Sequence, residues 1–244
     1  MTEVADLSEG KLDLGRVARD TLAVTGKRPG LVLGLAAVLS GLPSFFGSLL
    51  TSQHMHAPRD LLFSGWGLLH MVVVMLAGSF LAACLYSLSM RELEGETPTR
   101  AEVFAAGGQM FLPLLGLNIL LYLGLALGLI LLIVPGVMFG LAFCVAGPAL
   151  IAEVVGVTQA FRRSADLTRG SRWILFALFL LFFVASACVD SVLGAIGLAV
   201  SWGSPGLFSV PRLLGSAILS TVGTALTLPG MAAIYVQLRE LKGG

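Results

Sequence analysis

The sequence predicts an all-α integral membrane protein, a polytopic bundle of six transmembrane helices. Of its 244 residues, 57% are hydrophobic and only 12% are charged, and the mean hydropathy is +0.94. Soluble domains usually carry about 25% charged residues, so this chain cannot build a water-covered surface. The 30 glycines fit the same class, because small residues let helices pack closely in lipid. The apolar runs do not alternate as the strands of a membrane barrel would.

Six apolar runs are long enough to cross hydrocarbon about 30 Å thick, which takes roughly 20 helical residues. We expect one membrane domain over residues 1–244, built from three helical hairpins that each follow a cytoplasmic amphipathic helix. The expected spans are 29–50, 65–90, 111–133, 136–153, 173–200 and 210–236.

Two Pro and Gly pairs punctuate the third and fourth spans. Pro135 has no amide hydrogen and Gly136 tolerates unusual dihedral angles, so we expect a tight turn there. One long kinked helix is the alternative, but the apolar run is too long for a single crossing. Gly147 and Pro148 are the expected break in the fourth helix.

The distribution of Lys and Arg predicts the orientation, because these residues favour the cytoplasmic side. Six spans place both termini on one side of the membrane. That side receives thirteen of the fifteen Lys and Arg, and the other side receives only Arg59 and Arg212. We therefore expect both termini in the cytoplasm. The N-terminal 28 residues mix acidic and basic side chains and do not resemble a cleavable signal peptide.

Three cytoplasmic segments, at about 12–26, 99–108 and 155–170, have the pattern of amphipathic helices. The last places Phe161 and Ser164 on one side and charged residues on the other, and Gly170 is positioned to end it. Thr99 and Glu102 have the spacing of a capping box. These segments predict helices lying along the inner leaflet, with three ordinary polar loops as the alternative.

The loop between the fourth and fifth spans concentrates positive charge. We expect its arginines to contact lipid headgroups or to fix the topology: Arg162, Arg163, Arg169 and Arg172. Glu153, at the end of the fourth span, is expected to anchor this loop by pairing with an arginine, or else to lie among the headgroups.

Asp190 is an acid inside an apolar run, and Arg212 begins the next span at comparable depth. A structural ion pair between them is the main hypothesis. Proton coupling or ligand contact is the alternative, because charges within a span are costly and often functional.

The sequence predicts no catalytic residues, no cofactor and no metal site. It contains no P-loop, no G-x-S-x-G and no H-E-x-x-H motif, and its three cysteines fall within apolar runs. His54 and His56 alone are weak evidence for a metal, and His70 fits an interior polar group. The net charge of +1 argues against a nucleic-acid partner.

A resemblance to a known family begins at the Pro135–Gly136 pair and runs through residue 176. It includes Pro148 to Leu150 with Glu153, the Ala-x-Arg-Arg-Ser pattern of Ala160 to Ser164, and the stretch from Leu167 to Trp173. The C-terminal "IYVQLRE" is similar to the closing stretch of the same family. This region resembles the bacterial multi-pass family labelled glycerophosphoryl diester phosphodiesterase membrane domain, here without the phosphodiesterase barrel. The resemblance implies the bacterial inner membrane and no inherited activity.

These observations predict a non-enzymatic inner-membrane protein that acts at the cytoplasmic leaflet, in lipid interaction, membrane homeostasis or scaffolding. Its expected partners are membrane lipids, particularly anionic ones. Three G-x-x-x-G spacings fit packing within the monomer and also permit a homo-oligomer or a membrane-protein partner. The alternative function is a transporter or channel for an apolar or amphiphilic solute.

Overall fold

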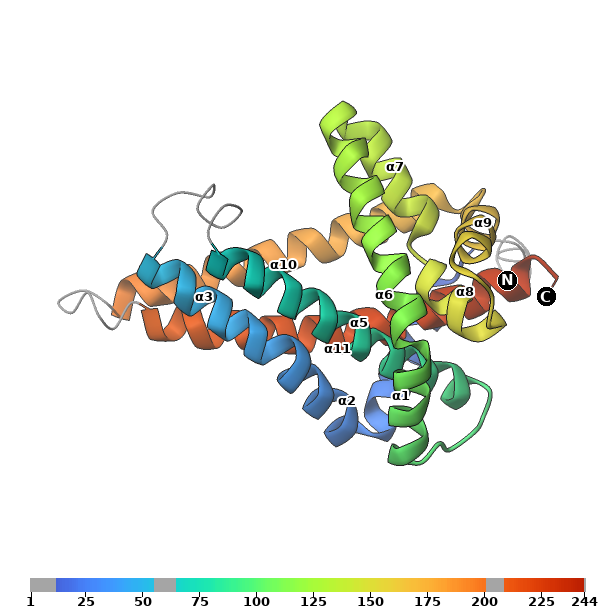
Figure 1. The fold of residues 1–244 in the computed structure, drawn as a ribbon, viewed down its shortest axis with the longest axis horizontal. Helices are drawn as coiled ribbons and strands as arrows, with labels where there is room; N and C mark the ends of the chain where they lie inside the picture. The colour runs from blue at the N-terminus through green and yellow to red at the C-terminus, as the bar shows by residue number, and fades with distance from the viewer. Residues whose placement is uncertain (1–11, 55–64, 201–208, 244) are drawn as a thin grey trace, which may run out of the picture. The chain divides into compact units, whose positions relative to one another are not determined.

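The computed structural model describes residues 12–54, 65–200 and 209–243. All regular secondary structure in these ranges is helical (Figure 1). In chain order the helices are α1 (Leu14–Lys27), α2 (Pro29–Ala36), the π-helical turn η1 (Ala37–Gly41), α3 (Leu42–His54), α5 (Gly65–Leu93), α6 (Arg100–Leu131), α7 (Ile133–Phe143), α8 (Ala146–Glu153), α9 (Val157–Thr168), α10 (Arg172–Val200) and α11 (Ser209–Leu241).

Within the described residues, six helical stretches have the length and composition to cross a membrane, and each overlaps one of the six expected spans. This makes the chain a multi-pass membrane protein by length and composition. The stretches are Pro29–Leu49, Gly65–Leu93, Arg100–Leu131, Val134–Glu153, Arg172–Val189 and Leu213–Leu241.

The chain divides into two compact units, which are described separately. Unit 1 comprises Met1–Arg28, Ala82–Leu178 and Leu226–Gly244, and unit 2 comprises Pro29–Leu81 and Phe179–Ala225. Every Asp, Glu, Lys and Arg side chain that the structure describes belongs to unit 1. The chemistry of charged groups is therefore a property of unit 1 within the described part of the chain.

Helix α6 begins with the expected capping box. The hydroxyl of Thr99 accepts from the Glu102 amide at 3.4 Å, and the Thr99 amide donates to the Glu102 carboxylate at 3.1 Å. The helix then continues without interruption to Leu131. The segment 99–108 is thus the first part of a long helix, and not a separate helix before the third span. The helix continues even through Pro113, which lies in its interior.

Helices α6 and α7 pack together through glycine. A Cβ atom built on Gly128 would lie 2.8 Å from the Cα of Gly136, and one on Gly124 would meet the ring of Phe139 at 2.3 Å. Such contacts require the absence of a side chain, as in other G-x-x-x-G interfaces. Packing within the monomer therefore uses glycines of two of the three motifs.

The turn between these helices lies at Leu132, whose backbone is extended (φ −165°, ψ 143°), and not at Pro135 and Gly136. Pro135 belongs to the first turn of α7, where a missing amide hydrogen costs no helical bond. Gly136 serves the close approach to α6.

The fourth span is broken just before Gly147 and Pro148. Helix α7 ends at Phe143 and α8 begins at Ala146, so the break falls at Cys144 and Val145. Gly147 and Pro148 are buried in the first turn of α8. A Cβ atom on Gly147 would lie 2.7 Å from the Tyr86 ring, so glycine here admits Tyr86.

Unit 2 contains a row of paired hydroxyl groups, which we call the hydroxyl ladder. Ser40 of η1 with Ser44 and Ser48 of α3 recur every four residues and face Ser216, Ser220 and Thr224 of α11. The Ser44 hydroxyl donates to Ser220 at 2.8 Å, and the Ser48 and Ser216 hydroxyls are 2.9 Å apart. Beside this row, a Cβ atom on Gly41 would lie 2.4 Å from the Thr221 hydroxyl.

Candidate functional site

Helix α9 is fixed to unit 1 by its buried face. Ala160, Ser164, Leu167 and Thr168 on this face are fully buried. The hydroxyls of Ser164 and Thr168 donate to the Ala142 carbonyl at 2.9 and 3.2 Å. That carbonyl lies in the last turn of α7, where the helix itself supplies no partner. The apolar face of α9 therefore packs against protein, whereas the sequence placed it in the lipid leaflet.

The end of α9 follows the expected signal. The helix stops at Thr168, and Gly170 has a positive φ of 96°, a conformation that side chains other than glycine rarely adopt. The next helix, α10, begins at Arg172. The "TRGSRW" segment is consequently a tight corner that brings two arginines to the start of α10.

Glu153 is the centre of a three-residue cluster in unit 1, the Glu153 cluster, with Arg163 and Tyr235. The Arg163 Nε donates to Glu153 Oε1 at 2.7 Å, and the Tyr235 hydroxyl donates to the same atom at 2.9 Å. Glu153 ends α8, where the helix dipole disfavours a negative charge, so two donors offset an unfavourable position. The carboxylate raises the pKa of the Arg163 guanidinium above its usual value. The anchoring expected of Glu153 is made to Arg163.

The four loop arginines therefore have different environments. The Nε of Arg163 donates to Glu153, and the Arg163 side chain is 33% exposed. Arg162 and Arg169 are exposed. These two side chains form what we call the α9 arginine surface.

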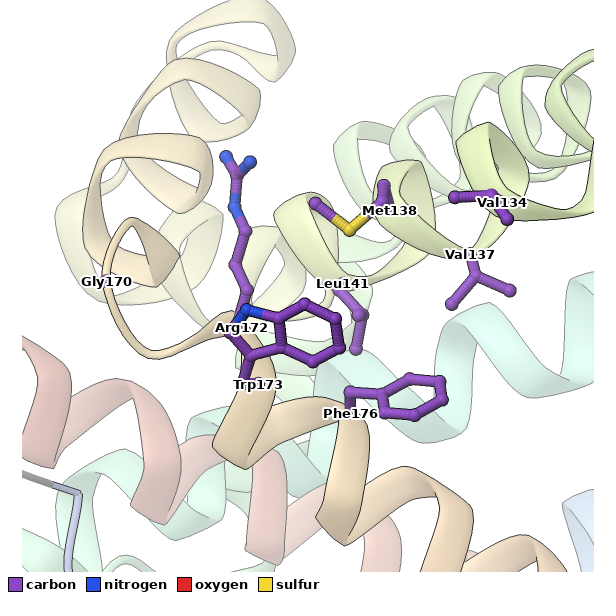
Figure 2. A pocket seen from close by; sticks show the side chains of 8 residues that line it. All are labelled: Val134, Val137, Met138, Leu141, Gly170, Arg172, Trp173 and Phe176. Atoms are coloured by element: carbon purple, nitrogen blue, oxygen red, sulfur yellow. The ribbon is translucent and has the colours of Figure 1, made fainter.

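Arg172 lines a pocket between α7 and the start of α10 (Figure 2). The pocket has a volume of about 450 Å³, and its lining residues are Val134, Val137, Met138, Leu141, Gly170, Arg172, Trp173 and Phe176. The Nε atom of Arg172 is buried and has no hydrogen-bond partner. A buried unpaired donor is costly, and such groups commonly indicate a ligand or ion.

The buried carboxylate of Glu92 ties the end of α5 to the chain after α1. The Glu92 side chain is only 2% exposed, and its Oε1 lies 3.4 Å from the Arg28 Nε. The Arg28 guanidinium also donates to the Pro98 carbonyl. Breaking such a pair by removing one partner leaves a buried charge uncompensated. This contact joins three segments of unit 1 before α6 begins.

Sequence reasoning did not single out Tyr235, Glu92, Arg28 or the pocket. Tyr235 lies in "IYVQLRE", a stretch that the sequence connects only with the family resemblance. Glu92 is one of several acids in "RELEGE" after the second span, and nothing in that stretch distinguishes it. Their partners are set by packing between distant segments.

Other candidate residues are only partly described. The side chains of Asp190, Arg212 and His54, and the whole of His56, lie outside the described part of the structure. His70 of α5 lies against Gly47 of α3, where a Cβ atom would be 2.5 Å from its Nε2. Glycine at position 47 thus makes room for the imidazole.

No protein-family model, curated protein or solved structure matches the chain. The resemblance of residues 135–176 to the phosphodiesterase-associated membrane family remains a hypothesis.

Proposed function

We propose that this is a non-enzymatic, multi-pass protein of the bacterial inner membrane that holds anionic lipid headgroups at the cytoplasmic leaflet. The observation that carries the proposal is the α9 arginine surface. Arg162 and Arg169 are exposed on a helix whose opposite face is anchored by buried residues and by Ser164 and Thr168. A rigid helix that presents cations at the end of two membrane-crossing segments suits contact with phosphate groups.

The expected gain is electrostatic and modest for each residue. A basic side chain near an anionic leaflet contributes roughly 1 kcal/mol. Because α9 is held by the protein, it loses little conformational entropy when lipid binds. The electrostatic gain is therefore not offset by the cost of ordering the helix. Arg163 contributes indirectly, by fixing α9 to Glu153.

Helix α1 supplies a second observation in favour of leaflet contact. Its side chains Val17, Thr21 and Val24 are buried, whereas Leu14 is 41% exposed and Leu22 is 63% exposed. Leu14 and Leu22 are eight residues apart and lie within a quarter-turn of each other around the helix axis. The exposed Arg19 lies on the same side of the helix, next to Leu22. Exposed leucines next to a cation match the pattern of a helix at the boundary between headgroups and acyl chains.

The proposed orientation places both termini, α1 and α9 on the cytoplasmic side. The excess of Lys and Arg supports it, and so does the gathering of the described charged side chains in unit 1. The proposal includes three transmembrane hairpins, with α1 and α9 as the cytoplasmic amphipathic helices, and membership of the resembled family.

The transporter hypothesis relied on an open break in the fourth span. At that break, residues Ala146 to Leu150 are buried, and Tyr86 fills the space beside Gly147. Closed packing at this point does not favour a solute path there.

A lipid-dependent protection experiment tests the proposal. The full chain is placed in nanodiscs of phosphatidylcholine alone or mixed with phosphatidylglycerol, and amide hydrogen exchange is followed across residues 154–171. Phosphatidylglycerol should slow exchange in this segment, and the Arg162→Gln/Arg169→Gln double variant should lose the difference.

Asp166 provides a matched control, because it is exposed on the same helix but carries the opposite charge. Asp166→Asn should strengthen the effect of phosphatidylglycerol. Equal exchange in the two lipids for all three proteins would show that the α9 arginine surface holds no headgroup.

A further inference from the structure

The α7–α10 pocket has the two-part character of an amphiphile site. Val134, Val137, Met138 and Leu141 recur along one face of α7. Seven helical steps of 1.5 Å separate the first from the last, which gives an apolar wall about 10 Å long. Phe176 and Trp173 of α10 complete the pocket, and Figure 2 shows their rings facing this wall. The volume of about 450 Å³ lies within the range of about 300 to 1,000 Å³ typical of ligand sites.

One end of the pocket carries unsatisfied donors. The Arg172 Nε is buried without a hydrogen-bond partner. Arg172 is also the first residue of α10, whose first backbone bond runs from the Leu175 amide to the Ser171 carbonyl. The amides before Leu175 therefore lack a helical partner and add partial positive charge at the same end. A guanidinium beside a helix N-terminus matches a phosphate group in both charge and geometry.

The position of the pocket in the chain selects the kind of ligand. Its apolar wall belongs to the candidate span Val134–Glu153, and Arg172 begins the candidate span Arg172–Val189. The donor end thus coincides with the start of a span, where lipid headgroups lie, and the wall follows a span, where acyl chains lie. Trp173, which is 82% exposed, has the amphipathic ring typical of that boundary.

From these observations we propose that the α7–α10 pocket binds one anionic glycerophospholipid, with its phosphate on Arg172 and one acyl chain along α7. Among the described residues that line the pocket, none is acidic, so an ammonium headgroup would find no countercharge. This favours an anionic lipid over a zwitterionic one. The inference rests on the proposed lipid function for its ligand, but it concerns a site separate from the α9 arginine surface.

Tryptophan quenching can observe this site directly. The full chain with Trp66→Phe and Trp202→Phe retains only Trp173, whose ring lines the pocket. It is reconstituted in phosphatidylcholine nanodiscs with increasing amounts of phosphatidylglycerol brominated in its acyl chains. Trp173 should be quenched at a lower mole fraction than by brominated phosphatidylcholine.

Two variants separate the headgroup from the acyl chain. Arg172→Gln should raise the mole fraction for half-quenching about tenfold to a hundredfold, the usual effect of losing a charge-assisted hydrogen bond. Arg172→Lys, which keeps the charge and loses Nε, should retain a preference for phosphatidylglycerol. Val137→Phe should reduce quenching by filling the space beside the wall. Unchanged thermal unfolding midpoints establish that each variant is folded.

The remaining arms decide between sources of the anion and between the two proposed sites. Inorganic phosphate at millimolar concentration should not displace the lipid; displacement would mean that the site binds a free anion and would overturn the lipid assignment. An Arg172→Gln effect without a Val137→Phe effect would place the headgroup outside the pocket and overturn it too. Equal quenching by both lipids that does not change with Arg172→Gln would also overturn the lipid assignment.

Arg162→Gln is the matched charge control, because it removes an equal charge from the exposed face of α9. It should leave the quenching of Trp173 unchanged. Loss of quenching with Arg162→Gln as large as that with Arg172→Gln would mean that surface charge alone concentrates the lipid, and the pocket proposal would fail. Failure of the α9 exchange experiment with selective quenching retained would reject the surface and keep the pocket.

Discussion

Tyr235→Phe should lower the free energy of unfolding clearly, although it removes only one oxygen atom. Tyr235 is completely buried, and its hydroxyl donates to the charged Glu153 at 2.9 Å. A hydrogen bond to a charged group contributes about 1.5 to 3 kcal/mol, and phenylalanine fills the same space without restoring it. For a chain of this size, 1 kcal/mol corresponds to about 2 to 4 °C in the unfolding midpoint, so a decrease of about 3 to 12 °C is expected.

The comparison with Arg163→Gln tests the reasoning behind that number. The Arg163 and Glu153 side chains are 33% and 25% exposed, so water screens their attraction, and the loss should be about 1 kcal/mol or less. Both donors share Glu153 Oε1, so the double variant should deviate from additivity by at least about 0.5 kcal/mol. The assay is thermal unfolding of the purified full chain in one detergent. A harmless Tyr235→Phe, or strict additivity, would refute the shared-acceptor explanation.

Three further substitutions have matched controls in the chain. Val154 has a left-handed backbone (φ 48°) and is 72% exposed, so Val154→Gly should raise the unfolding midpoint by relieving about 1 kcal/mol of strain, whereas Val154→Ala should not. Gly128→Ala places a Cβ 2.8 Å from the Gly136 backbone and should destabilise the protein by about 1 to 3 kcal/mol. Its control is Gly116→Ala in the same helix, which meets no atom within 4 Å and should not lower the unfolding midpoint. Ser220→Ala removes bonds to Ser40 and Ser44 and should lower stability by about 0.6 to 1.7 kcal/mol, whereas Ser191→Ala, whose exposed hydroxyl bonds only within its own helix, should have a smaller effect in the same measurement.

The sequence predicted those features whose cause is local. A span needs about 20 apolar residues in a row, and a capping box needs two residues three positions apart, so the six spans and the Thr99–Glu102 cap could be predicted. The positive φ of Gly170 also follows from local chemistry.

The sequence did not predict features that depend on a distant partner. Tyr235 and Glu153 are separated by 82 positions, and Arg28 and Glu92 are separated by 64. Pro135 also depended on packing. A proline fits a loop and the first turn of a helix equally well, and the close approach of Gly136 to Gly128 accompanies its position in α7. The apolar face of α9 was predicted to face lipid, but protein covers it. An apolar stripe alone does not reveal which of the two covers it.

The hydroxyl ladder has a consequence for helix register. Its members repeat every four residues on both helices, so sliding α11 along α3 by one turn, about 5.4 Å, would bring most hydroxyls opposite another hydroxyl. Repeating hydrogen bonds therefore select which faces meet but discriminate weakly between neighbouring alignments. The Gly41–Thr221 contact has no such repeat: one turn away, the residue opposite Thr221 is Ala37 or Phe45, each of which carries a side chain. A single glycine, and not the six hydroxyls, thus selects one alignment of these two helices.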